Sequence, residues 1–316
     1  MIRDGVTQVK MAQKSPISEI HTLALSSART VEDSGWLGRL PGVKIHSRAE
    51  GVALIFLVFL VLAAVVPGSL ASFAPNDIHP QAALVPPSRQ YWLGTDELGR
   101  DIWSRLVHAA RVEMFIALSA IGLSLVVGVP LGLLAGTYSG TLDMIIMRAQ
   151  DGLLAFPSIL FAILVVSALG PSAFTIILVM ALVYVPRFAR LVRGSVLTIK
   201  QLDYVLASRV IGAPTSRIMF RTILPNTMAP VLVQATIGMA FTILTEASLS
   251  YLGLGVQPPT PTWGTMLQAA QRFSVLAPWY LLAPGVSIFL TVLVFNFLGD
   301  RLRDHLDPRL RGARSA

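Results

Sequence analysis

The sequence contains no cysteine, and this absence excludes a disulfide framework and thiolate-based metal or redox chemistry. Charged residues are also scarce, at 13% of the 316 residues, whereas a soluble globular domain has roughly one quarter. Hydrophobic residues make up 54% of the chain, and the mean hydropathy is +0.67. The composition therefore predicts a protein whose surroundings are mostly lipid.

Motifs for nucleotide binding and catalysis are missing as well. The chain has no G-x-x-x-x-G-K-[ST] loop, so it has no loop of its own to hold nucleotide phosphates. It has neither an H-E-x-x-H zinc motif nor a G-x-S-x-G nucleophile elbow, and its five histidines do not pair at metal-ligand spacing. We therefore expect no catalytic residue, no metal site and no cofactor in this chain, and no enzyme activity of its own.

The formal net charge of +8 could also belong to a nucleic-acid-binding protein. Such a protein spreads its basic residues over a polar surface. Here the lysines and arginines lie between long apolar runs, which favours a membrane protein.

Charge-free runs of about 20 residues, the length that crosses a bilayer, predict an all-α membrane protein with six transmembrane helices. These runs are 51–66, part of 114–142, two within 152–186, then 230–251 and 279–298. The run 152–186 is too long for one crossing. A turn at Gly170, Pro171 and Ser172 is expected to divide it, because proline does not continue a helix.

The distribution of basic residues predicts the orientation, because short cytoplasmic loops carry an excess of lysine and arginine. With the N-terminus inside, the head, the loop near 137–148, the segment 187–221 and the tail together hold 20 of the 25 lysines and arginines. Both termini are therefore expected in the cytoplasm. The polar head is much longer than the charged start of a signal peptide, so the first helix is expected to remain as an uncleaved anchor.

The basic segment 187–226 is too long to be a simple turn. Residues 201–211 have helical apolar spacing, and Gly212 supplies a helix stop. Thr215 is expected to cap a second short helix, and Leu224–Pro225 lead back to the membrane. Two short helices joined at a glycine predict a rigid projection that docks into a groove of a partner. An equal alternative is an interfacial helix on anionic lipid, held by Arg187, Arg190, Arg193 and Lys200.

This segment resembles the EAA loop of permease subunits of binding-protein-dependent ABC importers. That pattern is Glu-Ala-Ala, three residues, Gly, nine residues, a hydrophobic residue, any residue and Leu-Pro, and the spacing is intact here. Leu206 replaces the glutamate and Thr222 the hydrophobic residue, so docking is expected to depend on shape and apolar contact. The resemblance implies contact with an ATPase through Asp203, Tyr204, Leu206, Ala207, Ser208, Gly212, Ala213, Leu224 and Pro225.

Four further segments are similar to the C-type permease subunits of oligopeptide and dipeptide importers. They are 91–111 and the segments that begin at Phe156, Ser250 and Phe295, and the resemblance covers about residues 89–312. It implies a type I ABC importer permease fold in the cell (inner or plasma) membrane and transport of di- or oligopeptides. Importers of nickel chelates or glutathione share the architecture, and these solutes are the alternative.

The resemblance also implies a complex of this chain with a B-type sister permease, two ATPase subunits that bind ATP and Mg²⁺, and an extracytoplasmic solute-binding protein. The expected parts are a cytoplasmic segment (1–48), the first transmembrane helix (49–67), an extracytoplasmic segment with a short helix (68–112), a five-helix permease core with the loop 187–226 (113–300) and a cytoplasmic tail (301–316). The rival class is a stand-alone proton-coupled transporter, but the sequence has no convincing internal repeat.

Two sets of polar residues are candidates for finer roles. In the outer segment, Thr95 or Asp96 is expected to cap a short helix and Asp101 to pair with Arg105. A structural role is preferred there, and contact with the binding protein is the alternative for Trp92, Asp96, Arg100, Asp101 and Trp103.

In the membrane a carboxylate costs on the order of 3 kcal/mol, so Asp151 and Glu246 are expected to face protein or water. Hydrogen bonding between helices or an interfacial position is preferred, and the alternative is that they line the pathway, where Glu246 would receive the amino end of a peptide.

Small residues recur four apart in the second predicted helix, at Gly128, Gly132, Gly136 and Gly140. Such a run lets a neighbouring helix approach closely. Packing within this chain is the preferred interpretation, and a face that slides during gating is the alternative, with a kink at Pro130.

Overall fold

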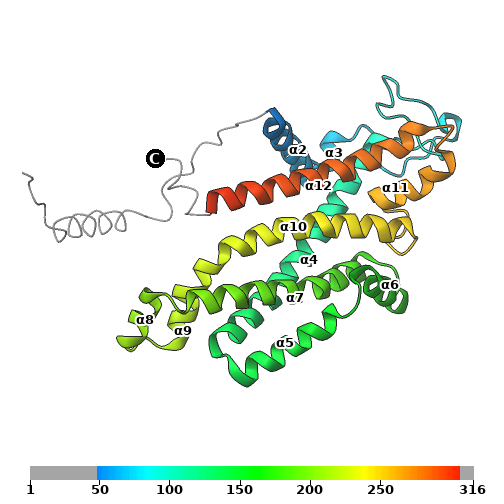
Figure 1. Cartoon of the computed structure of the whole chain (residues 1–316). Helices are drawn as coiled ribbons and strands as arrows, with labels where there is room; N and C mark the ends of the chain where they lie inside the picture. Colours follow the sequence, from blue (N-terminus) through cyan, green and yellow to red (C-terminus); the bar gives the residue numbers. More distant parts are fainter. Residues whose placement is uncertain (1–47, 307–316) are drawn as a thin grey trace, which may run out of the picture. The chain divides into compact units, whose positions relative to one another are not determined.

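The computed structural model describes residues 48–306, and all regular secondary structure in that range is helical (Figure 1). The predicted cytoplasmic head up to residue 47 and the tail from residue 307 lie outside the described residues. The longer helices are α2 (Arg48–Val65), α4 (Ile102–Tyr138), α5 (Gly140–Leu154), α6 (Ser158–Leu169), α7 (Ala173–Ile199), α10 (Leu224–Tyr251) and α12 (Pro278–Leu306). The short elements are α3 (Pro67–Leu70), η1 (Pro80–Ala82), α8 (Asp203–Val210), α9 (Thr215–Arg217), the π-helical turn η2 (Ile218–Ile223), α11 (Trp263–Ala270) and η3 (Gln271–Phe273).

The prediction of apolar spans is confirmed for most of them. Within the described residues, four helical stretches are long and apolar enough to cross a membrane: α4, α7, α12 and the continuous stretch Thr215–Tyr251, which includes α10. Helices α5 and α6 qualify together as one broken span, bent by 82°. A shorter apolar helix covers Gly51–Val65. The expected turn at Gly170 does separate α6 from α7.

Two helices extend further than the apolar pattern predicts. Helix α4 begins at Ile102, so the short helix expected in 68–112 and the second span are one helix. Helix α7 continues past Pro186 to Ile199. Charged residues end the apolar run in both cases. They do not end the helix, because a charged side chain does not prevent its backbone from continuing the helical hydrogen bonds.

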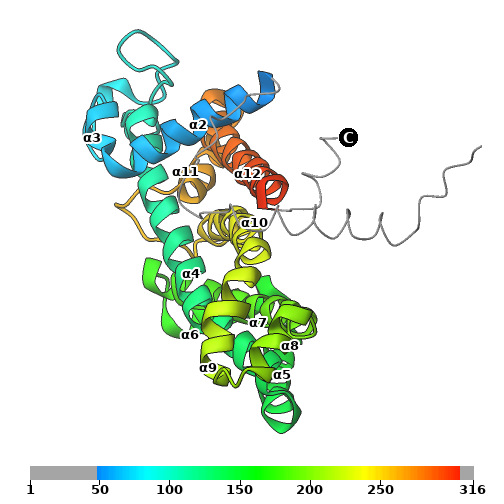
Figure 2. The same ribbon diagram turned by 90° about the vertical axis from the view of Figure 1, so that its left-hand side faces the viewer.

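Helices α7, α10 and α12 run side by side in Figure 1, and Figure 2 looks along them. Helix α4 crosses this layer and packs along α7 through its glycines. A Cβ added at Gly128 would lie 2.8 Å from Val185 O, and one added at Gly136 would lie 2.7 Å from Val196 Cβ. The small-residue face therefore packs within this chain, as preferred. Gly140 is not part of it, because it starts α5 with a φ of +66° and has open space around it.

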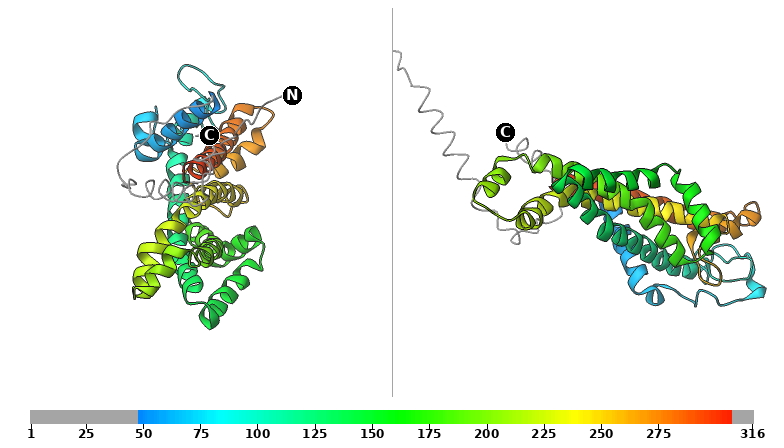
Figure 3. Two further views of the ribbon diagram at one scale, coloured as in Figure 1. Left: turned by 60° about the vertical axis from the view of Figure 1, so that its left-hand side comes forward. Right: turned by 90° about the horizontal axis from the view of Figure 1, so that it is seen from below.

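Irregular structure gathers at the two ends of α10, as the right-hand view in Figure 3 shows. At one end lies the knob, residues 200–223, which contains α8, α9 and η2. At the other end lie α11 and the cap, residues 66–101. The cap packs against the start of α12 at Gly94, where an added Cβ would lie 2.6 Å from Trp279 Nε1. These two ends hold most of the residues to which the sequence assigned a function.

Candidate functional site

The knob is a helix–glycine–helix unit, as the sequence predicted. Gly212 has a φ of +81°, which ends α8, and Ala213 N donates to Ser208 O at 3.1 Å across the turn. The predicted cap by Thr215 is wrong: Pro214 occupies the N-cap position, and Thr215 is the first residue of α9 without a side-chain capping bond. The ring of Pro214 fixes its φ, here −64°, and with a ψ of 145° the residue has the extended backbone of an N-cap.

Exposed apolar side chains form a ridge along α8. Leu202, Leu206 and Val210 lie four residues apart, so they share one face of the helix, and Val210 is 87% exposed. Ile211 extends the ridge and is 83% exposed. Beside the ridge, Val205 of α8 is fully buried and anchors the helix. Contiguous apolar surface of this kind marks an interaction site.

The expected coupling residues occupy this same unit. Asp203, Tyr204, Leu206 and Ala207 are exposed, and Ser208 Oγ donates to Tyr204 O at 2.8 Å. Leu224 and Pro225 begin α10. Helices α9, η2 and α10 form one continuous helical stretch, so the knob is joined to α10 without a loop between them.

All four basic residues proposed for lipid contact have protein partners, and for Arg187 these are Ser158 and two aromatic rings. Arg193 binds both carboxylate oxygens of Asp143, at 2.5 and 2.6 Å. Arg190 binds Asp151 at 2.5 Å, and both of these side chains are about half exposed. Lys200 Nζ donates to Gly136 O at 3.0 Å. These contacts fasten α7 to α5 and to the end of α4, which favours docking over a lipid-resting helix.

The cap is held by polar residues that the sequence assigned to binding-protein contact. Asp96 is fully buried and accepts from Leu98 N and Arg100 N, each at 2.9 Å, and from Arg100 Nε at 2.6 Å. Asp101, not Thr95 or Asp96, caps a helix, since it accepts from Ser104 N at the start of α4.

Few of the cap residues assigned to binding-protein contact are exposed at the surface. Trp103 Nε1 donates to Leu70 O at 2.8 Å and is only partly exposed, whereas Trp92 is 59% exposed. The predicted pair of Asp101 with Arg105 is wrong. Arg105 is buried, and its Nη1 donates to Pro75 O at 2.9 Å, because that helix face lies under the cap. Contact with a binding protein therefore stays a prediction, with Trp92 the most accessible of the five residues.

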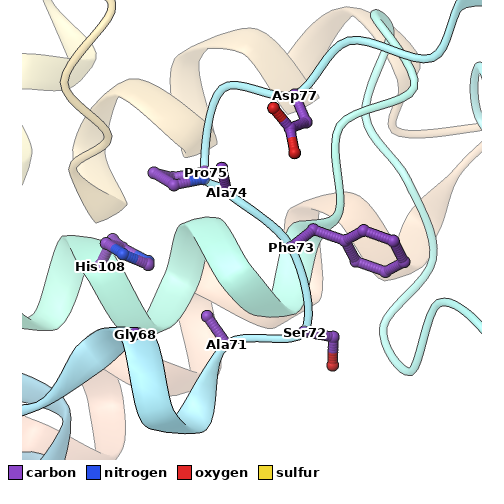
Figure 4. A pocket seen from close by; sticks show the side chains of 8 residues that line it. All are labelled: Gly68, Ala71, Ser72, Phe73, Ala74, Pro75, Asp77 and His108. Atoms are coloured by element: carbon purple, nitrogen blue, oxygen red, sulfur yellow. The ribbon is translucent and has the colours of Figure 1, made fainter.

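A shallow depression lies where the cap meets α4 (Figure 4). Its lining comes from residues 68–77 and from His108 of α4, whose Nδ1 is 2.8 Å from Ser104 O. Its titratable side chains are Asp77 and His108. No group of three or more metal-ligating side chains occurs within 48–306, here or elsewhere.

Glu246 of α10 is fully buried and faces Glu113 of α4, which is also fully buried. The two carboxyl groups are neighbours in this buried site, and neither Oε2 atom has a hydrogen-bond partner among residues 48–306. Ser250 Oγ donates to Glu246 Oε1 at 2.6 Å, and Trp263 N donates to Glu113 Oε1 at 3.2 Å. This joint connects α4, α10 and the start of α11. A pathway role for Glu246 or Asp151 stays a prediction.

Sequence reasoning missed Glu113. It lies one residue before an apolar run, where a charged residue is ordinarily taken for the polar end of a membrane helix. The available signal was the run of helix-compatible residues from Ile102 onward, which places Glu113 inside a helix and not at its end.

Comparison with known proteins gives a consistent result. Residues 128–312 match the family described as binding-protein-dependent transport system inner membrane component. A di/tripeptide transport system permease protein of Pseudomonas aeruginosa is 44% identical over 274 residues, which cover 85% of this chain and 90% of that protein. A dipeptide transport system permease protein of Haemophilus influenzae is 42% identical over 84% of this chain and 92% of that protein. A glutathione transport system permease protein of Pectobacterium atrosepticum is 47% identical over 71% of this chain and 75% of that protein.

Among solved structures, a chain of the methionine ABC transporter MetNI in an inward-facing conformation is similar, with a TM-score of 0.54. It is 18% identical, and the match covers 64% of this chain and 96% of that chain, so the likeness concerns the fold. The described helices thus have the fold of an ABC importer permease. Given this fold, its apolar spans and the extent of the family match, the chain belongs to the inner membrane components of binding-protein-dependent transport systems.

Proposed function

We propose that this chain is the membrane-spanning permease subunit of an ATP-driven importer for di- and oligopeptides. The observation that carries the proposal is the knob, whose exposed apolar ridge is continuous with a membrane-spanning helix. Relatives with dipeptide or di/tripeptide permease names support peptides as the solute. The glutathione permease supports the alternative solute, which is itself a small peptide-like molecule.

We further propose six spans, with both termini in the cytoplasm. The broken α5–α6 pair counts as one span and α2 as another, beside α4, α7, α10 and α12. Helix α2 leads into the cap and α12 starts beside it, so both helices leave the cap toward the side of the knob. That side also carries Arg190, Arg193 and Lys200, as expected of a cytoplasmic surface. The divisions 1–48, 49–67, 68–112, 113–300 and 301–316 keep their predicted sides.

In the proposed cycle, the chain itself performs no chemistry and is not an enzyme. Two ATPase subunits bind ATP and Mg²⁺, close on each other and move the knob. The knob moves α10 because the helix is continuous, and the path between this chain and a sister permease changes its open side. A solute-binding protein supplies the peptide at the cap.

The test is co-purification of the ATPase subunits with the assembled complex. Val210→Glu places a charge on the apolar ridge and is expected to reduce the ATPase recovered by about tenfold or more, with loss of ATP-dependent uptake. Val275→Glu is the matched control, because Val275 is 91% exposed but lies next to η3, away from the knob.

Unchanged ATPase recovery and uptake in Val210→Glu would contradict the role of the knob. Peptide uptake that persists without the ATPase subunits would favour the stand-alone transporter instead.

A further inference from the structure

Arg187 is a membrane-helix cation that has no carboxylate partner among residues 48–306. It belongs to α7 and is partly exposed. Its guanidinium lies over two aromatic rings, 4.7 Å from the centroid of Tyr184 and 5.5 Å from that of Phe241. Nη2 also lies 3.4 Å from Ser158 Oγ at the start of α6. The rings and the hydroxyl hold the guanidinium in place but leave its charge uncompensated.

The neighbouring arginines of α7 differ in this respect. Arg190 and Arg193 each bind an aspartate of α5, Asp151 and Asp143. None of the ion pairs formed within the part of the chain that the structure describes includes Arg187. The chain therefore neutralises the two arginines nearer the knob and leaves the third for another anion.

The depth of Arg187 makes an uncompensated charge costly. About 21 Å of helix separates Arg187 from the start of α7, and the hydrocarbon core is about 30 Å thick. Ser158 is at a similar depth, because α6 runs back over 12 residues to the same end of α7. Arg187 thus lies inside the apolar layer, where a charge needs protein or water beside it.

A second observation also indicates that protein or water, and not lipid, lies beside Arg187. Residues 155–157, between α5 and α6, are exposed on this chain and have no regular helical structure. Irregular backbone at membrane depth does not occur against lipid, because its polar groups would be unsatisfied; it occurs against protein or water. The break and Arg187 adjoin through Ser158, so this surface faces away from lipid.

We infer that Arg187 binds the carboxylate of the peptide during its passage. This inference rests on the proposed function and adds a residue that recognises the solute. A guanidinium binds a carboxylate through two parallel hydrogen bonds, and the aromatic rings stabilise the cation while no anion is present. A site that binds and releases a carboxylate in each cycle needs the weaker stabilisation by the aromatic rings while no carboxylate is bound. Arg193 does not need such rings, because Asp143 is its permanent partner.

The first experiment uses the absence of native cysteines in this chain, since Ser158→Cys introduces a single thiol beside Arg187. In the assembled complex in lipid vesicles, an anionic methanethiosulfonate reagent should modify this thiol about tenfold faster than a cationic one. Arg187→Gln should abolish this preference. The matched control is the double variant Arg190→Gln with Asp151→Asn, which removes a neutral ion pair without changing the net charge and should keep the preference. Equal rates for the two reagents, no modification by either, or a preference that survives Arg187→Gln would overturn the inference.

Two sources of the anion are then distinguished on the same Ser158→Cys complex. Tri-alanine should slow modification of the introduced thiol, and tri-alanine amide, which lacks the carboxylate, should not. Protection that requires anionic lipid in the vesicles and is indifferent to tri-alanine would identify a lipid phosphate and overturn the inference. Loss of the sister permease from the Arg187→Gln complex would identify an acidic residue of that subunit, with the same consequence.

Uptake separates this inference from the proposed function. Arg187→Gln should lower tri-alanine uptake about tenfold with normal assembly, and Arg187→Lys should restore part of it. If the unaltered complex transports no peptide, the proposed function fails, whatever the labelling shows. If it transports tri-alanine at the same rate with and without Arg187, only the role of Arg187 fails.

Discussion

At the scale of single residues, the joint between Glu113 and Glu246 is energetically costly, because two carboxyl groups are buried side by side. Both side chains are fully buried, and their Oε2 atoms have no hydrogen-bond partner among residues 48–306. Two carboxylates without a proton would repel each other, and none of the ion pairs in this range supplies a cation to offset the charge. One proton shared between them would remove the repulsion and allow a hydrogen bond between α4 and α10.

This arrangement predicts a difference between two substitutions at one position. Glu113→Gln supplies an amide that donates to Glu246, so thermal unfolding of the purified complex should stay close to that of the unaltered protein. Glu113→Ala leaves the Glu246 carboxyl buried without its partner and should destabilise the chain by about 1–3 kcal/mol. Equal stability of the two variants would contradict a shared proton.

The same joint bears on the pathway role considered for Glu246. Because Glu246 is fully buried within the chain, Glu246→Gln is expected to transport at a near-normal rate. A loss confined to peptides with a free amino end would instead support a pathway role.

Single residues were also where prediction from the sequence was least complete. That Glu246 needs a polar environment followed from its apolar neighbours, but its partner Glu113 is more than 100 positions away, and one sequence contains no signal for such a contact. Likewise, i, i+4 spacing made Asp101 and Arg105 look like a pair. Burial of Arg105 under the cap gave it other acceptors, Pro75 O and Asn76 Oδ1.

At the scale of elements, the contact between α4 and α7 depends on glycines that leave no room for a methyl group. A Cβ at Gly128 would lie 2.8 Å from Val185 O and 2.9 Å from Phe188 Cβ, whereas a Cβ at Gly122 of the same helix has nothing within 4 Å. Backbone and a ring-bearing residue cannot move aside cheaply in a packed interface.

Gly128→Ala is therefore expected to lower the stability of the complex by about 1–3 kcal/mol, because the two helices must separate. Gly122→Ala is the matched control and should be neutral or slightly stabilising, since alanine is the better helix former by about 1 kcal/mol. Thermal unfolding in the same detergent measures both. Indifference to Gly128→Ala would mean that the two helices move apart freely, as the sliding alternative requires.

Elements were predicted well where an apolar run and a turn signal coincide, as at Gly170 and Gly212. The ends of α4 and α7 were not, because hydropathy records where lipid ends and not where the helix ends. The division of one span into α5 and α6 was missed for a related reason. Phe156 and Pro157 lie within an uncharged run, so the charge pattern did not mark the 82° bend, although Pro157 was an available signal for a helix break.

At the scale of the whole molecule, the proposed topology places the knob and η3 on opposite sides of the membrane. Ser216→Cys in the knob and Val275→Cys beside η3 each introduce a single thiol at an exposed position of a chain without other cysteines. In intact cells, a membrane-impermeant thiol reagent should modify the Val275→Cys variant at once and the Ser216→Cys variant only after permeabilisation. The reverse order would invert the orientation that the basic residues predict.

The continuity of Thr215–Tyr251 also makes this helix a lever arm. Its 37 residues measure about 55 Å, so a tilt of a few degrees at the knob becomes a displacement of several ångströms at the far end. Glu246 lies about one turn from that end, beside Glu113 of α4. The π-helical turn η2, at the knob end of the arm, has looser winding and offers a place to absorb a twist. The length and continuity of this helix, and not only the strength of the docking contact, would then determine how far its end beside the cap moves when the ATPase subunits close.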